Sequence, residues 1–491
     1  MRNRREFIKQ GLISGATFAL SGACRFGQDR IGIDAGAIGQ LRASLRGQLI
    51  LPDDEAYDAA RRVFWWNATT EKRPGIIARC ERPDDIARCV EFSRQHDLVL
   101  AVRGGAHSFL GWSTCDDGLV IDVSPMKEIA VDPGKRTVRA GAGVVTGELI
   151  EATSSHELVP VLGQCPTVGI SGLTLGGGLG WLSGKYGATC DNLLSADLMT
   201  ADGQSIVASA TENPDLFWAI RGGGGNFGIA TSFEYRLHPL SVVLAGVLTY
   251  SLADAPAMLG FYRDFMAEAP DELQALATLG WDGEPVLSLV VCFSGDLNDG
   301  EKIIQSLRMR LKPVRDTMRP RAYSDTYSGT LLAEAALEAA ADPEAFSHTR
   351  GCYLEGLPDE AIDVVLDRFA HAPNSGARIG LDHYMHGAVC RVAPDSTAFE
   401  LRRPGALHVW ISSRWSDPAV TAAMVAWSEK TWSALRAYSG GRIYANYPNA
   451  EGEAAARSAY GGNYSRLLEI KKKYDPSNVF RRNQNLQPTL A

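Results

Sequence analysis

The sequence predicts an α+β fold in two domains, and three of its features carry this prediction. Helix and strand signals alternate between residues 83 and 155, which is typical of α/β or mixed α+β domains. Residues 286–435 contain strand patterns joined by helical ones, which favours an antiparallel sheet backed by helices. The chain has 491 residues, too many for one ordinary domain, and we place the domain boundary near Leu240.

In the first half, Pro83 followed by two aspartates suits the first turn of a helix. The apolar run 98–102 is typical of a short buried strand. Further strands are expected at 119–123 and 137–140, and a helix at 144–155.

The second half has longer elements. Asp417 and Pro418 suit a helix start, and Gly440 with Gly441 suits its end. Within this helix an apolar stripe is expected at Met424, Trp427, Thr431 and Leu435. The other expected elements are strands at 286–293 and 407–412 and a helix at 301–311.

The composition is that of a folded, acidic protein, with 45% hydrophobic residues, 22% charged residues and a net charge of -8. These values exclude a disordered chain, and without a long basic run nucleic acid is not an expected partner. Beyond the first two dozen residues no apolar stretch is long enough to span a bilayer. The nine cysteines lack metal-ligand spacing, so no metal site is expected.

Residues 1–23 have the pattern of an export signal. Arg4 and Arg5 precede an uncharged run from Gly11 to Ala23, as the basic and apolar parts of a signal peptide do. The paired arginines resemble a twin-arginine leader of bacteria, so we expect export to the periplasm or the exterior. An ordinary basic helix is the alternative. Lipid attachment at Cys24 is a minor one, because the leucine expected before such a site is displaced by one position.

Four segments carry the candidate site. The first, VRGGAHSFLG at 102–111, places two glycines after an expected strand, where backbone N–H groups can approach a diphosphate. Taken alone, a glycine-rich turn beside an ordinary histidine explains it more simply. The second, 163–192, is dense in glycine but matches neither the GxGxxG fingerprint nor a Walker loop. Its Cys165 lies among loop residues, where a thiolate can react.

The third segment, RGGGGNFG at 221–228, contains four consecutive glycines. Each would cost a regular element ~1 kcal/mol, so a shaped loop is expected. The fourth segment contains YANYP, YGGNY and YDPSNVFRRNQN between residues 444 and 485. If YANYP is a strand, Tyr444 and Tyr447 point to opposite faces, and only one of them can face a common site.

In this order the segments resemble the FAD-linked oxidases of the berberine-bridge-enzyme-like group, which have the vanillyl-alcohol-oxidase, or PCMH-type, FAD-binding fold. The matching motifs run from about residue 73 to 488 as RGGxHS, CPTVGxxGLTLGGGxG, YGxxCDN, RGGGGNFGI, YxNY and YDPxNVFRxNQN. The resemblance implies a PCMH-type FAD-binding domain over 45–240, completed by 441–491. It also implies a substrate domain over 241–440.

The resemblance implies FAD held by two covalent bonds, from His107 to the 8α-methyl and from Cys165 to C6 of the isoalloxazine. Val168 lies at the position that controls oxygen access and is similar to the oxygen-reactive members, although plain packing also explains it. Ala106 replaces a frequent glycine and would strain the loop if its φ is positive. The other implied cofactor-binding residues are Arg103, Gly104, Gly105, Ser108, Gly169, Gly172, Gly176, Gly177, Gly178, Gly180, Asp191, Asn192, Gly228, Ile229, Asn483 and Asn485.

Two tyrosines are the expected catalytic residues, because a substrate hydroxyl must lose its proton while hydride leaves its carbon. The resemblance implies Tyr447 as the base, and a tyrosine needs help to act as a base at neutral pH. Tyr384 is the expected partner, lowering the effective proton affinity or holding the substrate. An ordinary half-buried aromatic is the alternative for Tyr384, and Asp382 shares its face if the segment is a strand.

We therefore expect a secreted FAD-dependent oxidase that oxidises an alcohol or sugar hydroxyl and reduces O₂ to H₂O₂. Its expected partners are a small-molecule substrate, O₂ and the twin-arginine export machinery. The alternatives are a dehydrogenase with another acceptor, an oxidative cyclase of secondary metabolism, and a flavin-binding protein without turnover.

Overall fold

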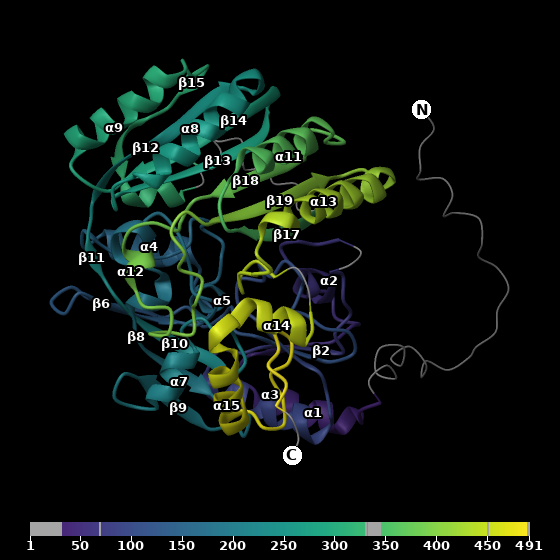
Figure 1. Cartoon of the computed structure of the whole chain (residues 1–491). Helices are drawn as coiled ribbons and strands as arrows, with labels where there is room; N and C mark the ends of the chain where they lie inside the picture. The colour runs from purple at the N-terminus through teal and green to yellow at the C-terminus, as the bar shows by residue number, and fades with distance from the viewer. Residues whose placement is uncertain (1–31, 68–69, 329–330, 332–344, 449–450, 489–491) are drawn as a thin grey trace, which may run out of the picture.

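The computed structural model describes residues 32–67, 70–328, 331, 345–448 and 451–488. It confirms the α+β class: two sheets in one part and a larger sheet backed by helices in the other are stacked in Figure 1. The expected leader at 1–23 and Cys24 lie outside the described residues. In the part of the chain that is described, no helix is long and apolar enough to cross a membrane.

The first sheet has four strands in the order β1-β2-β4-β3. Helix α3 (Pro83–Gln95) begins at the expected proline and crosses from β2 to β3, and both of these strands run parallel to β4. The expected strand at 98–102 is β3, which ends at Arg103. The first glycine-rich segment follows directly. The strands are β1 (Gln48–Ile50), β2 (Ile76–Arg79), β3 (Leu100–Arg103) and β4 (Leu119–Asp122).

The second sheet has five antiparallel strands in the order β5-β6-β10-β8-β9. The strand expected at 137–140 is β6, and the helix expected at 144–155 is α4 (Thr146–Ser154). The strands are β5 (Ile129–Asp132), β6 (Thr137–Gly141), β8 (Leu193–Met199), β9 (Ser205–Ser209) and β10 (Ile229–Arg236).

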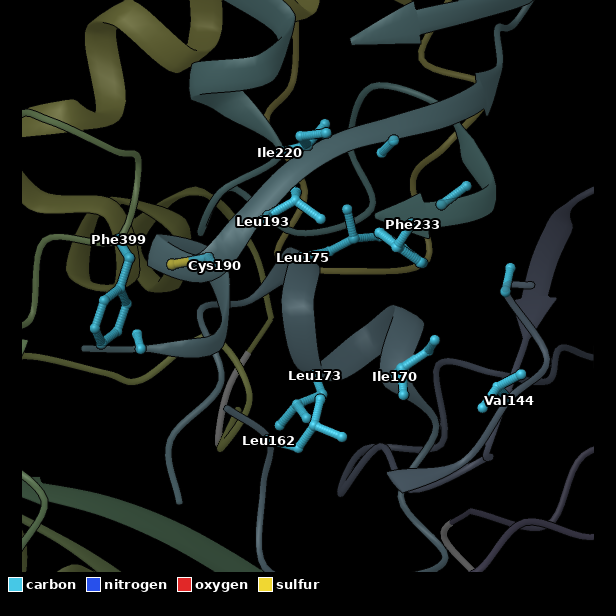
Figure 2. Close-up of a cluster of buried hydrophobic side chains, with 14 of the residues drawn as sticks. Val144, Leu162, Ile170, Leu173, Leu175, Cys190, Leu193, Ile220, Phe233 and Phe399 are labelled. Atoms are coloured by element: carbon cyan, nitrogen blue, oxygen red, sulfur yellow. The ribbon is translucent and has the colours of Figure 1, made fainter. Parts of the chain in front are cut away.

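Short elements join these two sheets. Helix α5 (Ile170–Leu175) lies inside the second glycine-rich segment, and its apolar side chains belong to one buried cluster with Leu162, Val144 and Phe233 (Figure 2). This packing fixes the glycine-rich loop against the sheet. The remaining elements of this part are α1 (Ala35–Ser44), α2 (Tyr57–Arg61), β7 (Leu158–Val159), α6 (Ser183–Tyr186), η2 (Thr189–Asn192), α7 (Pro214–Ala219) and β11 (His238–Pro239).

The large sheet begins after β11 and has the order β15-β12-β14-β13-β18-β19-β17, with β16 paired to β12. Its pairings are antiparallel, as expected. The strands are β12 (Val242–Ser251), β13 (Leu273–Asp282), β14 (Glu284–Phe293), β15 (Arg315–Asp316), β16 (Arg319–Ala322), β17 (Phe346–Leu354), β18 (Arg378–Asp382) and β19 (Leu407–Trp415).

The two faces of this sheet have different neighbours, because strand side chains alternate between faces. Leu287 and Leu289 of β14 join the core formed with the helices, whereas Val290 joins the core of the first part. The expected helix at 417–440 is a short η5 (Pro418–Val420) followed by α13. The helices of this core are α8 (Ala255–Ala267), α9 (Leu297–Arg310), α11 (Asp359–Ala370) and α13 (Thr421–Leu435).

The C-terminal segment returns to the first part of the chain, where α15 (Tyr464–Tyr474) lies beside α7 in Figure 1. Its Lys471 is fully buried, and the ammonium donates to Asp475 at 2.6 Å and to the carbonyl oxygens of Asn226 and Phe480 at 2.9 Å each. All three ammonium donors are used, so this buried charge holds the C-terminal segment to the RGGGGNFG loop. The helix before it is α14 (Glu453–Tyr460).

Candidate active site

A cavity of about 1280 Å³ lies between the first part of the chain and the large sheet. This exceeds the 300–1,000 Å³ typical of sites for drug-sized ligands, so it has room for a dinucleotide and a substrate. Buried polar atoms with no partner among the described residues lie on its lining residues: Oγ of Ser113, Nε2 of Gln164 and Oδ1 of Asn483. Such atoms need a ligand or water, and the residues present therefore fit FAD.

Two glycines bring the first two motifs together. A Cβ at Gly105 would lie 2.3 Å from the backbone N of Gly169, and a Cβ at Gly169 would lie 2.4 Å from the backbone N of Gly105. No other residue type fits at either position without a shift of the backbone. The contact places the RGGAHS and CPTVG loops side by side.

His107 and Cys165 are linked through Thr167, which lies between Cys165 and Val168 in the CPTVG motif. The hydroxyl of Thr167 lies 3.0 Å from Nε2 of His107 and 3.3 Å from Sγ of Cys165. The ring of Phe64 stacks on the imidazole at 3.9 Å between centroids. Burial lowers the pKa of His107 to about 4, so the imidazole is neutral and keeps a lone pair for bonding near pH 7.

The expected strain at Ala106 is present, since this residue has a φ of 58°. Its carbonyl accepts a hydrogen bond from the backbone N–H of Phe64 at 3.1 Å. A left-handed conformation costs a non-glycine residue about 1–2 kcal/mol. The backbone of the loop that carries His107 is therefore slightly strained, and this hydrogen bond helps to stabilise its conformation.

A buried carboxyl group joins the two predicted tyrosines. The hydroxyl of Tyr447 donates to Oδ2 of Asp382 at 3.3 Å, and Nε1 of Trp410 donates to Oδ1 at 3.1 Å. The hydroxyl of Tyr384 lies 3.5 Å from the same Oδ2. The Tyr384 hydroxyl has one proton, and its shorter contact is to Oε1 of Gln164, to which it donates at 2.8 Å. The two tyrosines therefore meet at Asp382, at the end of β18.

The electrostatics of this cluster follow from its burial. Burial raises the pKa of Asp382 to about 7 against three hydrogen bonds that lower it. Burial, followed by the nearby Asp382 carboxylate, raises the pKa of Tyr447 well above its usual value. Tyr447 therefore stays protonated by itself, and Asp382 is the group of the pair that can take up a proton near pH 7.

The YANYP segment is not a strand, because the Tyr447 N–H donates to the Tyr444 carbonyl at 2.8 Å and closes a turn. The two rings contact each other at 5.3 Å between centroids instead of facing apart. The two hydroxyls have different partners. The hydroxyl of Tyr444 accepts from the backbone N–H of Gly178 and from the Asn446 amide at 3.1 Å each. Both tyrosines line the cavity.

The structure places the other predicted residues in two groups. Those that line the cavity with His107, Cys165, Tyr384 and Tyr447 are Gly104, Gly105, Ala106, Ser108, Val168, Gly169, Gly172, Gly176, Gly228, Ile229 and Asn483. Those outside its lining are Arg103, Gly177, Gly178, Gly180, Asp191, Asn192 and Asn485.

Several residues of the second group have partners within the protein. Asp191 accepts two hydrogen bonds from the buried Arg402, at 2.7 and 2.9 Å. Asn192 donates to the carbonyl oxygens of Tyr186 and Ala188 at 3.0 and 2.9 Å. The YGxxCDN motif thus anchors the glycine-rich loop to the segment that carries Arg402.

Sequence reasoning left four further lining residues unassigned. The sequence places Asp382 two residues before Tyr384, and an acid beside a predicted catalytic tyrosine is itself a signal. Thr167 lies inside CPTVG, two residues after the reactive cysteine. Gln164 and Trp410 carry no local signal, because they meet Tyr384 and Asp382 only through tertiary contacts.

The glycine-lined cavity and its unpartnered polar atoms fit a flavin-binding oxidoreductase, and comparisons with known proteins show this class. Residues 74–209 match the FAD binding domain family, and residues 443–487 match the family described as berberine and berberine like. The chain belongs to the FAD-linked oxidoreductases of the berberine-bridge-enzyme-like family. It is an FAD-dependent oxidoreductase.

Individual relatives cover nearly the whole chain. (R)-6-hydroxynicotine oxidase of Paenarthrobacter nicotinovorans is 32% identical over 459 residues, which cover 91% of this chain and 97% of that protein. FAD-linked oxidoreductase pgmH of Aspergillus terreus is 33% identical over 473 residues, covering 90% and 94%. The crystal structure of 6-hydroxy-D-nicotine oxidase from Arthrobacter nicotinovorans has a TM-score of 0.81 at 30% identity, covering 91% and 98%.

Proposed function

We propose that this protein is an oxidase of alcohols, with FAD linked covalently to His107 and Cys165. The observation that carries the proposal is the hydrogen bond from Tyr447 to Asp382 beside the cavity. Oxidation of a CH–OH group releases a proton as well as a hydride, and this pair provides a place for the proton. The bound cofactor supplies the acceptor for the hydride.

The proton moves along this pair in two linked transfers. The substrate hydroxyl donates to the phenol oxygen of Tyr447, while the Tyr447 proton passes to Oδ2 of Asp382. Tyr447 is neutral before and after the step, which agrees with its raised pKa. The Tyr384 hydroxyl lies 3.5 Å from the same Oδ2, and its hydrogen bond to Gln164 holds it there.

The attachment of the cofactor rests on the other cluster. A neutral His107 whose Nε2 is bonded to Thr167 presents Nδ1 as the atom with a lone pair when Nε2 carries the proton. Cys165 lies within reach of the same hydroxyl. The two residues would hold one edge of the flavin ring, while Gly104, Gly105 and Asn483 would bind its dinucleotide part.

Molecular oxygen is the proposed electron acceptor, because Val168 is a small side chain on the cavity wall. Anaerobic mixing with a substrate should bleach the flavin absorbance, and air should restore it with one H₂O₂ released per turnover. Bleaching that persists in air would identify a dehydrogenase. No bleaching by alcohols, but bleaching by amines, would replace the alcohol proposal.

Export through the twin-arginine pathway is part of the proposal and rests on Arg4 and Arg5. Replacing both by lysine should retain the protein in the cytoplasm with its flavin attached. Export at the unchanged level would exclude this route, and the mature N-terminus of the exported protein, read by mass spectrometry, tests cleavage near residue 23.

A further inference from the structure

Gln164 joins the loop that carries Cys165 to the tyrosine cluster. Its Oε1 accepts the hydroxyl proton of Tyr384 at 2.8 Å, although the two residues are 220 positions apart in the chain. Gln164 belongs to the second glycine-rich segment, whereas Tyr384 follows β18 of the large sheet, and both residues line the cavity. This hydrogen bond therefore links the cofactor side of the cavity to the side that carries Asp382.

The backbone around Gln164 is held by the start of α4. The hydroxyl of Thr146 donates to the carbonyl oxygen of Cys165. The backbone N–H of Gly147 donates to the carbonyl oxygen of Pro166 at 2.9 Å. Thr146 and Gly147 are the first two residues of that helix, so the segment that carries Gln164 has a fixed place beside the cavity.

The Tyr384 hydroxyl lies between two acceptors but has one proton to donate. Oε1 of Gln164 is 2.8 Å away, and Oδ2 of Asp382 is 3.5 Å away. The first distance is that of an ordinary O–H···O hydrogen bond, whereas the second is longer than the usual range. The proton therefore points to Gln164, and the Tyr384 oxygen keeps its lone pairs for a donor on the side of Asp382.

This direction matters once Asp382 has taken up a proton. In the proposed reaction the proton passes from Tyr447 to Oδ2 of Asp382, which lies 3.3 Å from the Tyr447 hydroxyl. The protonated carboxyl group can then donate to the Tyr384 oxygen, and a hydrogen bond made by the protonated form favours that form. A Tyr384 proton that pointed to Asp382 would instead favour the carboxylate, and Asp382 would hold the substrate proton less well.

From this geometry we propose that Gln164 is a positioning residue for the reaction: by taking the Tyr384 proton, it makes the Tyr384 oxygen an acceptor for protonated Asp382. Gln164 acts through Tyr384 in this role and exchanges no proton itself. The assignment rests on the proposed function, because it takes Asp382 as the group that receives the substrate proton.

The other titratable groups packed around Asp382 are neutral near pH 7. Burial raises the pKa of the tyrosines and lowers the pKa of both histidines to about 3. The residue opposite Asp382 on β13 is the apolar Leu276. Arg378 of β18 and Arg414 of β19 keep their charge over this pH range. The groups meant are Tyr262 of α8, His383, Tyr384, His408 of β19, Tyr444 and Tyr447.

The titration of Asp382 tests the proposal without any substrate. Infrared difference spectra of the purified flavoprotein across a pH series follow the C=O stretch of the protonated carboxyl group, and Asp382→Asn identifies its band. Gln164→Met keeps the length of the side chain but removes the acceptor, so the Tyr384 proton turns to Asp382. The midpoint should fall by about half a unit to one unit, the shift expected from one neutral hydrogen bond. An unchanged or raised midpoint would overturn the proposal.

Two further variants separate this role from a purely structural one. Gln164→Glu keeps an acceptor oxygen, so its midpoint should stay at or above the wild-type value, and a fall equal to that of Gln164→Met would contradict the role of the acceptor. Tyr384→Phe has no hydroxyl to orient, so adding Gln164→Met to it should cause no further shift. A further shift in the double variant would show that Gln164 does not act through Tyr384.

The matched control is Gln95→Met on α3. The amide of Gln95 donates to Glu91 at 3.1 Å on the exposed side of this helix. The same substitution there should leave the Asp382 midpoint at the wild-type value, and a fall equal to that of Gln164→Met would contradict the assignment.

Flavin reduction gives an independent readout. Above the midpoint, Gln164→Met should lower the rate constant by up to about 10-fold, since a weaker base takes up the proton less readily. The substrate dissociation constant should stay unchanged. Failure of the proposed function has another result, because Tyr447→Phe and Asp382→Asn would then be reduced as fast as the wild type. If those two variants are slow and the Gln164→Met midpoint does not move, the function stands and this assignment is wrong.

Discussion

The hydroxyl of Thr167 lies 3.0 Å from Nε2 of His107, and the same hydroxyl lies 3.3 Å from Sγ of Cys165. A hydroxyl has one proton to donate and lone pairs to accept. It can therefore accept from the imidazole while donating to the sulfur, and in this way it fixes which nitrogen of the ring is available for bonding.

Covalent attachment of FAD can be measured directly as an increase in the mass of the intact protein. Wild-type protein should carry one FAD per chain after acid precipitation. His107→Ala and Cys165→Ala should each keep a flavin through the remaining bond, and the double variant should release it on denaturation. Intact-mass spectrometry after denaturation makes the measurement, and an unmodified wild-type mass would remove both attachment residues from the proposal.

Thr167→Val should slow attachment of the flavin, because valine keeps the shape but lacks the hydroxyl. Thr167→Ser keeps the hydroxyl and serves as the matched control, with attachment close to that of the wild type. The fraction of adduct is followed by intact mass during incubation of the apoprotein with FAD. Full adduct in the valine variant at the wild-type rate would show that the hydroxyl is not needed.

Tyr447→Phe should slow anaerobic flavin reduction by about 10²–10⁴-fold, the usual worth of general-base catalysis. The flavin should remain bound, since phenylalanine keeps the ring that stacks on Phe109 at 5.0 Å. Tyr444→Phe should have a smaller effect, because that hydroxyl bonds to Gly178 and Asn446 and not to Asp382. Stopped-flow reduction with one substrate decides the order, and a slower Tyr444 variant would reassign the base.

Asp382 should give the reaction its pH dependence. Its pKa of about 7 predicts that the rate of flavin reduction rises with pH through about 7 as the carboxylate forms. In Asp382→Asn the rate should be low and lack this rise. A profile in the variant that keeps the wild-type midpoint would assign the titration to another group.

The same carboxyl group should also affect stability. Its folded-state pKa is raised above the unfolded value of about 3.9. Its contribution to the free energy of unfolding is therefore complete below about pH 4 and is lost as pH rises through 7. In Asp382→Asn there is no carboxyl group to ionise, so this loss of stability at higher pH does not occur. The variant should therefore melt at a higher temperature than the wild type at pH 8, and the difference should shrink towards pH 4, as measured by differential scanning calorimetry.

Ala106→Gly should stabilise the protein by up to about 1 kcal/mol, because glycine adopts a positive φ without strain. Ala101→Gly, on the neighbouring strand β3, is the control and should destabilise it, since extended backbone gives glycine no advantage. Thermal midpoints of the two variants should move in opposite directions. A lower midpoint for Ala106→Gly would mean that the alanine methyl contributes packing that outweighs its strain.

The sequence predicted those features that are encoded locally. Pro83 marked a helix start, the run 98–102 a strand, and the motifs around His107 and Cys165 a shared site, because each signal lies within a few residues of chain. The link between the two motifs through Thr167 depends on the contact of Gly105 with Gly169, which spacing does not reveal.

The role of Asp382 was not predictable in the same way. It depends on the register of β18 against β19, which brings Trp410 across Gly380, and on a turn that directs Tyr447 to the same carboxyl group. A strand at YANYP would direct the two tyrosines to opposite faces, but the hydrogen bond from the Tyr447 N–H to the Tyr444 carbonyl closes a turn there. Tertiary contacts decided the first feature, whereas the second is a local turn.

The buried ammonium of Lys471 and the amide of Asn226 have a consequence for the order of synthesis. Asn226 donates to the Gln484 carbonyl, 258 positions later in the chain, at 3.1 Å. While the ribosome is still making the large sheet, the RGGGGNFG loop lacks the partners that shape it. We therefore expect the flavin to bind only after the chain is complete, and a change that blocks docking of residues 464–486 to give protein without bound flavin.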